Sequence, residues 1–228
     1  VHMTYKRLKN PPRSIKAQFY CVEEMDYLFN RMVPDVVLSP TLDPDLPSPG
    51  GNIRRIGPII RPFSRTSAQK GDVERVLVML SGSQFGTPVT FAHDRHDYRI
   101  DVVGRDAPAG SEPLPNNILF HGKMRDNSEL LQAADVMVVN GGFSAVSEAF
   151  VLQKPVVVLP IENHAEQWIN GHTVENLGVG VMADMHTMED TLVGVVANVE
   201  KYRQAYRDLP PPQNGALQAA DAILGALR

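Results

Sequence analysis

Three short polar segments carry residue types that suit binding of a phosphorylated ligand. The first spans residues 140–148, follows an apolar run and opens a helical one. Its two glycines let the backbone approach a ligand, and the amides at a helix start, with the Ser144 hydroxyl, form an anion site suited to a diphosphate. Glu148, one turn further on, has a carboxylate that can accept hydrogen bonds from ribose hydroxyls. The plainer alternative is a tight strand-to-helix turn in which Ser144 caps the helix.

The second segment, residues 160–167, ends in Glu166 and Gln167. A carboxylate beside a carboxamide offers several acceptors and two donors, which suits a ring of sugar hydroxyls. The alternative is that both are ordinary solvated residues of a first helical turn, where the macrodipole favours an acid. The third segment, residues 81–84, is rich in small residues and donors and could close over phosphates or sugar. A polar turn without a ligand explains it equally well.

The elements that must position these segments follow from hydrophobic patterning. Continuous apolar runs rich in β-branched residues predict strands at 76–80, 99–103, 118–121, 136–139, 156–159 and 179–182. Helical patterns lie between or after them, at 127–133, 144–153, 165–177 and 187–206. Apolar strands alternating with helices indicate an α/β fold, a doubly wound, Rossmann-like parallel sheet. In such a sheet ligands bind outside the carboxyl ends of the strands, where the three polar segments begin.

The first part of the chain differs from the rest. Residues 1–62 predict an acidic helix at 22–32, a short strand at 35–38 and a proline-studded linker, too little for a complete domain. Residues 63–228 predict the Rossmann-like domain and a last helix at 216–227. Because this helix follows three consecutive prolines, 210–212, we expect it to leave the sheet and pack elsewhere.

Composition excludes several classes of partner. A net charge of -4 and a pI near 6.0 give no general attraction for nucleic acid. Cys21 is the single cysteine, which predicts a cytoplasmic protein without an internal disulfide. No apolar stretch reaches the ~20 residues of a membrane span. No pair of histidines has the spacing of a zinc motif, and we expect no metal site.

In their order and spacing the three segments resemble the loops of GT-B glycosyltransferases, over roughly residues 52–183. The nearest parallels are the UDP-glycosyltransferases of natural-product and xenobiotic metabolism and the GlcNAc transferase of peptidoglycan synthesis. The resemblance implies the C-terminal half of a GT-B fold, which binds a nucleotide-sugar donor. It implies a donor site made of Gly82, Ser83, Gln84, Met124, Gly141, Gly142, Ser144, Ala145, Glu148, Glu166 and Gln167.

In this resemblance the glycine-rich turn binds the diphosphate and Glu148 holds the ribose. Glu166 and Gln167 contact the donor sugar, and backbone groups at Met124 meet the base. Two departures stand out: Asn140 occupies the place of a phosphate-contacting histidine in many members, and the segment between Leu80 and Tyr98 is short for a full helix. A neutral amide thus replaces a possible cation.

The resemblance also implies what the chain lacks. In the family the acceptor site and the general base, a His or an Asp, belong to an N-terminal domain, of which residues 1–62 could supply only the last strand and the linker. We therefore expect a truncated protein or one partner of a split enzyme, inactive alone, with the catalytic base elsewhere and the acceptor unknown.

For the intact protein the resemblance implies transfer of a sugar from a nucleotide diphosphate sugar, with UDP as the expected nucleotide, to an acceptor hydroxyl with inversion. Amides at the helix start would stabilise the leaving diphosphate, so neither a metal nor another cofactor is expected. Two alternatives stay open. One is a UDP-sugar 2-epimerase or nucleotide-sugar hydrolase on the same scaffold, and the other is a non-catalytic module that binds nucleotide sugar.

Overall fold

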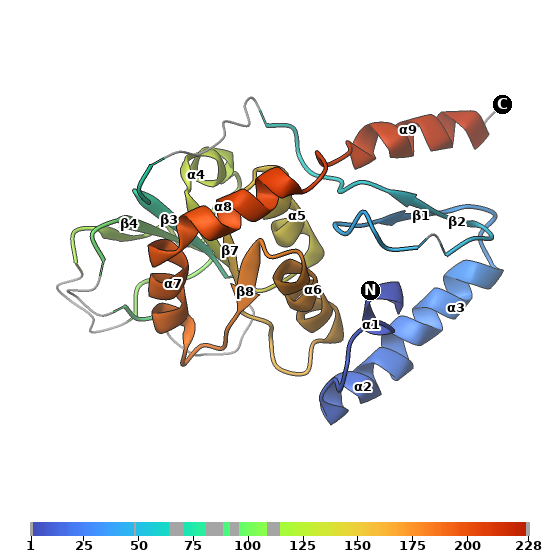
Figure 1. Ribbon diagram of the computed structural model, residues 1–228, viewed down its shortest axis with the longest axis horizontal. Helices are drawn as coiled ribbons and strands as arrows, with labels where there is room; N and C mark the ends of the chain where they lie inside the picture. Colours follow the sequence, from blue (N-terminus) through green and yellow to red (C-terminus); the bar gives the residue numbers. More distant parts are fainter. Residues whose placement is uncertain are drawn as a thin grey trace.

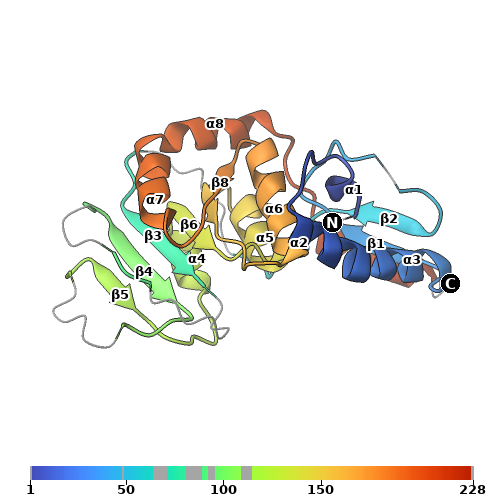
Figure 2. The same cartoon turned by 90° about the horizontal axis from the view of Figure 1, so that it is seen from below.

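The computed structural model describes residues 2–47, 49–63, 71–80, 89–91, 96–108 and 115–226. Figures 1 and 2 show a larger part built on a central sheet and a smaller N-terminal part beside α6 (Ala165–Asn176). The sheet holds β3 (Arg75–Met79), β4 (Arg99–Val103), β5 (Ile118–Phe120), β6 (Val136–Val139), β7 (Val156–Val158) and β8 (Gly180–Met182). These are the six predicted strands, displaced by no more than a residue at each end.

All six strands are parallel, in the order β5-β4-β3-β6-β7-β8. Chain order reverses between β3 and β6, which are neighbours in the sheet but not in the sequence. This is the point at which ligands bind in open parallel sheets. The predicted doubly wound, Rossmann-like sheet is confirmed.

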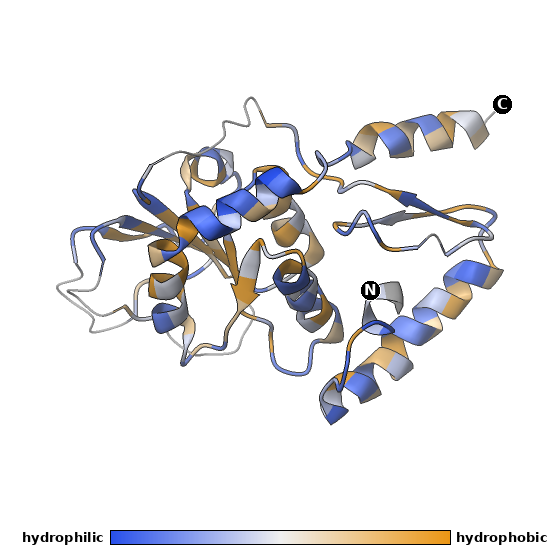
Figure 3. Ribbon diagram, in the orientation of Figure 1, coloured by the Kyte–Doolittle hydropathy of each residue, from blue (hydrophilic) through white to orange (hydrophobic). Residues whose placement is uncertain are grey.

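Helices cover both faces of the sheet, and each face has its own apolar core. On one face α4 (Ser128–Ala133), α5 (Phe143–Val151) and α6 pack over inward side chains of β3, β6 and β7. On the other, α7 (Met188–Ala197) packs over the alternate side chains of the same strands. Figure 3 shows the contrast between the mostly hydrophobic strands and the hydrophilic α8 (Val199–Asp208).

One predicted helix, 187–206, is two helices. The chain breaks at Asn198, whose φ of -118° and ψ of 26° are not helical. Its side chain donates to the Gly194 carbonyl, 2.9 Å away. Asparagine competes in this way for backbone groups that would otherwise continue a helix, and the prediction of one helix was wrong for that reason.

The N-terminal part is more ordered than its sequence predicts. It contains α1 (His2–Tyr5), and then α2 (Arg13–Gln18), a π-helical turn η1 (Phe19–Glu23) and α3 (Glu24–Met32) run on continuously. Strand β1 (Val37–Pro40) pairs in parallel with β2 (Ile53–Ile56), which lies inside the predicted linker. Prolines and glycines around this four-residue strand hide it in the sequence.

The N-terminal part is anchored on α6 by an aromatic cluster. Phe19 is fully buried and stacks on Tyr5 with ring centroids 3.6 Å apart, and both pack against Ile169 of α6. The Gln18 side chain also accepts a hydrogen bond from the Ala165 amide at the start of α6. The helix that carries Glu166 and Gln167 therefore borders both parts of the chain.

The last helix, α9 (Gly215–Ala226), leaves the sheet as predicted and lies beside β2 (Figure 1). The Gly57 amide donates to Gln218 Oε1 at 2.6 Å, and the Gly215 amide donates to the Pro58 carbonyl at 3.1 Å. The C-terminal helix is thus joined to the segment between the two parts.

Asp101, in the middle of β4, is fully buried beside two arginines and a histidine. Arg99 Nη2 and His121 Nε2 lie 2.7 Å from its Oδ1, and Arg75 Nε lies 3.6 Å from Oδ2. Burial alone would raise the pKa of this carboxyl. The hydrogen bonds from Arg99 and His121, with the charge of Arg75, outweigh burial and hold the pKa below its ordinary value.

We expect Asp101→Asn to lower the free energy of unfolding by about 2–4 kcal/mol at pH 7, because it leaves cationic groups without their carboxylate. The folded-state pKa is depressed, so this contribution is present at neutral pH and is lost as pH falls through that pKa. Urea unfolding at pH 7 and at acid pH measures both effects. The exposed Asp221→Asn is the control, with a change within about 0.5 kcal/mol. Equal stability of wild type and Asp101→Asn at pH 7 would contradict the argument.

Candidate functional site

The turn after β6 requires glycine at position 141. Gly141 has a φ of +87°, in the left-handed region that favours glycine. A Cβ here would lie 2.8 Å from Val158 Cγ1 and 2.9 Å from the Gln167 carbonyl oxygen, closer than real Cβ atoms approach. Before it, the Asn140 side chain donates to the Leu159 carbonyl at 3.3 Å. The turn is therefore clamped between β7 and α6.

Helix α5 begins directly after this turn without a side-chain cap. Gly142 is its N-cap and makes no side-chain hydrogen bond, and a Cβ at Gly142 would meet nothing within 4 Å. Ser144 is exposed in the first turn and Ala145 is half-buried. The alternative in which Ser144 caps the helix is wrong. Among the residues that the structure describes, nothing fills the space next to Gly142, so the start of α5 is accessible to an anion.

Glu166 and Gln167 lie beside this helix start. The Phe143 amide, first in α5, donates to Glu166 Oε1 at 3.4 Å. Gln167 is 8% exposed, and its Oε1 accepts a hydrogen bond from the Ile161 amide at 2.9 Å. The structure thus brings the first two predicted segments together. Gln167 is not the solvated residue of the alternative interpretation, and it holds the loop that precedes α6.

The sequence analysis missed Asn170, which completes this contact. Asn170 is buried on α6, and its Nδ2 donates to the Gly141 carbonyl at 2.9 Å. Asn170 lies one turn after Glu166, on the same face of the helix. The spacing of four residues between the acid and the amide could therefore have predicted that both point to the same site. Its hydrogen bond ties the glycine-rich turn to the helix that carries Glu166.

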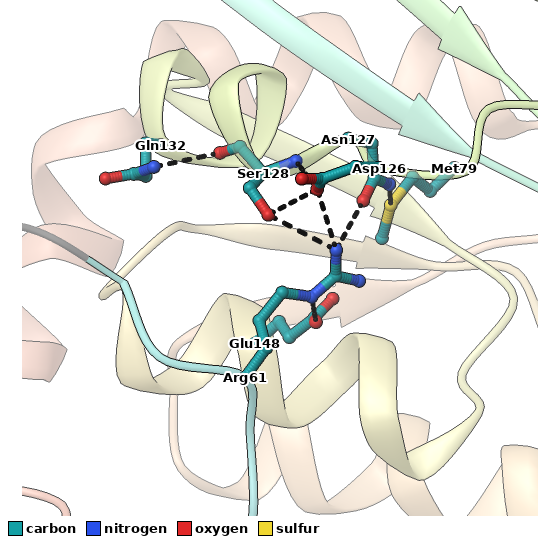
Figure 4. Close-up of polar contacts among 7 residues, drawn as sticks. All are labelled: Arg61, Met79, Asp126, Asn127, Ser128, Gln132 and Glu148. Atoms are coloured by element: carbon teal, nitrogen blue, oxygen red, sulfur yellow. Dashed lines mark hydrogen bonds and ion pairs between the residues drawn. The ribbon is translucent and has the colours of Figure 1, made fainter.

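Glu148 lies one turn into α5 and pairs with an arginine from the segment between β2 and β3. It is 6% exposed, and Arg61 Nε donates to its Oε1 at 2.6 Å (Figure 4). Burial raises the pKa of the Glu148 carboxyl above its ordinary value, and Arg61 offsets part of that rise. Arg61 was also missed, since nothing in a linker sequence shows which side chain it meets.

Arg61 also reaches the loop between β5 and α4. Its Nη1 lies 3.0 Å from Asn127 Oδ1, 3.4 Å from Ser128 Oγ and 3.5 Å from Asp126 Oδ1 (Figure 4). Met124, within this loop, is 38% exposed, so the loop is accessible at this point. Its contact with a base stays a prediction.

The third predicted segment cannot be compared with the structure. Gly82, Ser83 and Gln84 lie outside the described residues. Leu80, the residue before them, ends the central strand region and is buried in the core. The described remainder of the segment to Tyr98, residues 89–91 and 96–98, forms no helix.

A cavity of about 400 Å³ lies between the helix start and the N-terminal part. Phe143, Glu166 and Asn170 line one side, and Glu23 and Asp26 line the other. Burial raises the pKa of the Glu23 carboxyl, and the charge of Glu166 raises it further. The two carboxylates therefore face a shared space beside the start of α5.

Within the described ranges no three His, Cys, Asp or Glu side chains gather closely enough to hold a metal ion. In the same part of the chain no helix is both long and apolar enough to cross a bilayer.

Comparison with known proteins identifies the family of this site. The sequence profile of glycosyl transferase family 1 matches residues 54–199, which include β3 to β8 and every site residue above except Glu23 and Asp26. The chain belongs to this family. Membership confirms the resemblance to GT-B glycosyltransferases and favours a transferase over the epimerase, hydrolase and binding-module alternatives.

Curated relatives of this glycosyl transferase family 1 chain are also described as glycosyltransferases. An uncharacterized glycosyltransferase of Methanopyrus kandleri is 29% identical over 171 residues, which are 64% of this chain and 47% of the relative. An uncharacterized UDP-glucosyltransferase of Bacillus subtilis is 26% identical over 107 residues, 44% of this chain and 26% of the relative. The chain thus spans about half the length, or less, of these relatives.

The crystal structure of the kitacinnamycin glycotransferase matches 95% of this chain and 61% of its own, with a TM-score of 0.61 and 23% identity. This match covers the N-terminal part as well as the sheet, and it confirms the predicted fold class. The smaller part of the chain is therefore a regular element of the fold.

We expect Gly141→Ala to lower the free energy of unfolding by at least about 2 kcal/mol, since a Cβ would strain the left-handed backbone and clash with Val158 and α6. Thermal and urea unfolding measure this. Gly142→Ala is the matched control, with open space around its Cβ, and should cost less than about 1 kcal/mol. A Gly141→Ala protein as stable as Gly142→Ala would show that the turn is not clamped.

Proposed function

We propose that the chain is the donor-binding half of an enzyme that transfers a sugar from a nucleotide diphosphate sugar to an acceptor hydroxyl. The observation that carries this proposal is the open start of α5 after the clamped Gly141 turn, with Glu166 at its first amide and Glu148 one turn further on. An anion site, a carboxylate for the sugar and a carboxylate for the ribose then follow one another along one edge of the sheet.

The proposed reaction uses the α5 amides as an electrostatic trap for the leaving group. The acceptor oxygen attacks the anomeric carbon, the bond from that carbon to the diphosphate breaks, and the negative charge passes to the diphosphate. Amides of the Gly142–Ser144 turn and the Ser144 hydroxyl lie where they can stabilise this charge without a metal. The acceptor proton goes to a base in the other half of the enzyme, and attack opposite the leaving group gives inversion.

Glu166 has a specific part in this proposal. In the present structure its carboxylate occupies the Phe143 amide, which is one of the donors that a diphosphate would use. A bound diphosphate would take over this amide and leave the carboxylate to accept hydrogen bonds from sugar hydroxyls. Gln167, held by the Ile161 amide through its oxygen, would offer the sugar its amide nitrogen.

UDP is the proposed nucleotide. Support comes from the Bacillus subtilis relative, which is described as a UDP-glucosyltransferase. The role proposed for the buried Glu148 carboxylate, to accept hydrogen bonds from ribose hydroxyls, fits a ribonucleotide such as UDP. We also propose that the protein works in the cytoplasm, which its single cysteine supports.

A second half, in the same chain or in a partner, is proposed to carry the acceptor and the base. The η1–α3 helix exposes a run of large apolar side chains: Tyr20, Val22, Met25, Leu28, Phe29 and Met32. A contiguous apolar face of this kind marks a surface that another element covers. The chain also matches only 47% of the Methanopyrus kandleri relative. The cavity between Glu23 and Glu166 borders the same η1–α3 helix.

We expect Glu148→Gln to weaken UDP binding about tenfold or more, because ribose hydroxyls lose a charged acceptor. Calorimetric titration with UDP, UDP-glucose, UDP-GlcNAc and a dTDP-sugar measures the loss and identifies the preferred nucleotide. The exposed Glu74→Gln, directly before β3 at the amino end of the strand, makes the same change of charge outside the site and should bind as wild type does. If Glu148→Gln binds the nucleotide as tightly as wild type, Glu148 is not part of the site. If wild type binds none of the four ligands, the proposed function is contradicted.

A further inference from the structure

Arg61 connects two sides of the proposed nucleotide site, Glu148 of α5 and the 124–128 loop, although it belongs to neither element. It lies after β2, in the segment that connects the two parts of the chain. On one side its Nε donates to Glu148 of α5, and on the other its Nη1 meets the side chains of Asn127 and Ser128 at the start of α4 (Figure 4). These are the elements that, under the proposed function, meet the ribose and the base.

We propose that Arg61 is a positioning residue for the nucleoside of the donor: it fixes the Glu148 carboxylate and the 124–128 loop relative to each other, so that ribose and base meet them together. This inference rests on the proposed function. It concerns the part of the site that reads the nucleoside and leaves the diphosphate and the sugar to the residues already described.

The surroundings of Glu148 explain why a fixed partner is needed. A carboxylate that is only 6% exposed has little water to orient it, and its burial costs free energy unless a cation or donors satisfy it. The 2.6 Å hydrogen bond from Arg61 Nε supplies both charge and direction. A side chain oriented in this way before the ligand arrives loses less entropy on binding.

The loop on the other side is itself well tied, so Arg61 connects two ordered groups. Asp126 Oδ1 accepts from the Ser128 amide at 2.9 Å and from its hydroxyl at 2.6 Å. The Asn127 side chain points back to Met79 Sδ, 2.8 Å away at the end of β3. A planar guanidinium with several fixed donors can satisfy both sides at once, which a single ammonium group cannot do.

The test compares two ligands in two proteins. UDP carries both ribose hydroxyls, whereas 2′,3′-dideoxy-UDP has the same base and diphosphate without them. We expect Arg61→Gln to weaken UDP binding about tenfold and dideoxy-UDP binding only about threefold, because dideoxy-UDP keeps the base contact but lacks the ribose contact; calorimetry on the 228-residue chain measures both. Arg61→Lys should recover less than half of the lost binding free energy. The exposed Arg54→Gln on β2 removes the same charge elsewhere and should leave both affinities unchanged.

Each other outcome has a distinct meaning. Equal weakening for both ligands would show that Arg61 acts on the base or the diphosphate and not through the ribose contact of Glu148, and full recovery by Arg61→Lys would assign it to charge alone. Either result overturns the inference, and so does unchanged or tighter UDP binding by Arg61→Gln. In each of these cases the proposed function stands as long as wild type binds UDP. If wild type binds no nucleotide, both the proposed function and the inference about Arg61 are contradicted. Circular dichroism and thermal unfolding of each variant separate loss of the site from loss of the fold.

Discussion

The close contact between the Gly141 backbone and α6 determines the geometry of the whole site. At position 141 the chain passes between Val158 of β7 and the backbone of Gln167, with its carbonyl held by Asn170. Only glycine fits there. Because the turn is pressed against α6, the start of α5 and the side chain of Glu166 meet, although 23 residues separate the Phe143 amide from that carboxylate. The turn at Gly141, the start of α5 and the start of α6 thus come together because position 141 has no side chain.

Two buried acids illustrate different uses of a guanidinium. Asp101 is surrounded by Arg99, Arg75 and His121 and has a depressed pKa, as expected of a carboxylate whose charge serves stability. Glu148 has one arginine, from a connecting segment, and burial still raises its pKa. A carboxylate with spare accepting capacity at the ligand-binding edge of a sheet is the more useful of the two for holding hydroxyl groups.

The sequence predicted what depends on local pattern. Buried parallel strands are continuous apolar runs, so β3 to β8 were readable, and the glycines after β6 marked the turn. Contacts between distant segments were not readable. No periodic pattern in the sequence shows that Asn170 meets Gly141 or that Arg61 meets Glu148. Strand β2 was missed because it is only four residues long and is flanked by glycine and proline. Asn198 was visible in the sequence, but its helix-ending hydrogen bond to Gly194 depends on a rotamer that composition does not reveal.

The contacts of α9 with Gly57 and Pro58 mean that the chain crosses between its two parts twice and that the crossings touch. One of these crossings lies between β2 and β3 and the other between α8 and α9, so segments far apart in the sequence support each other where the parts meet. Together with the Phe19 cluster on α6, this double connection joins the N-terminal part to the rest of the chain at two separate places.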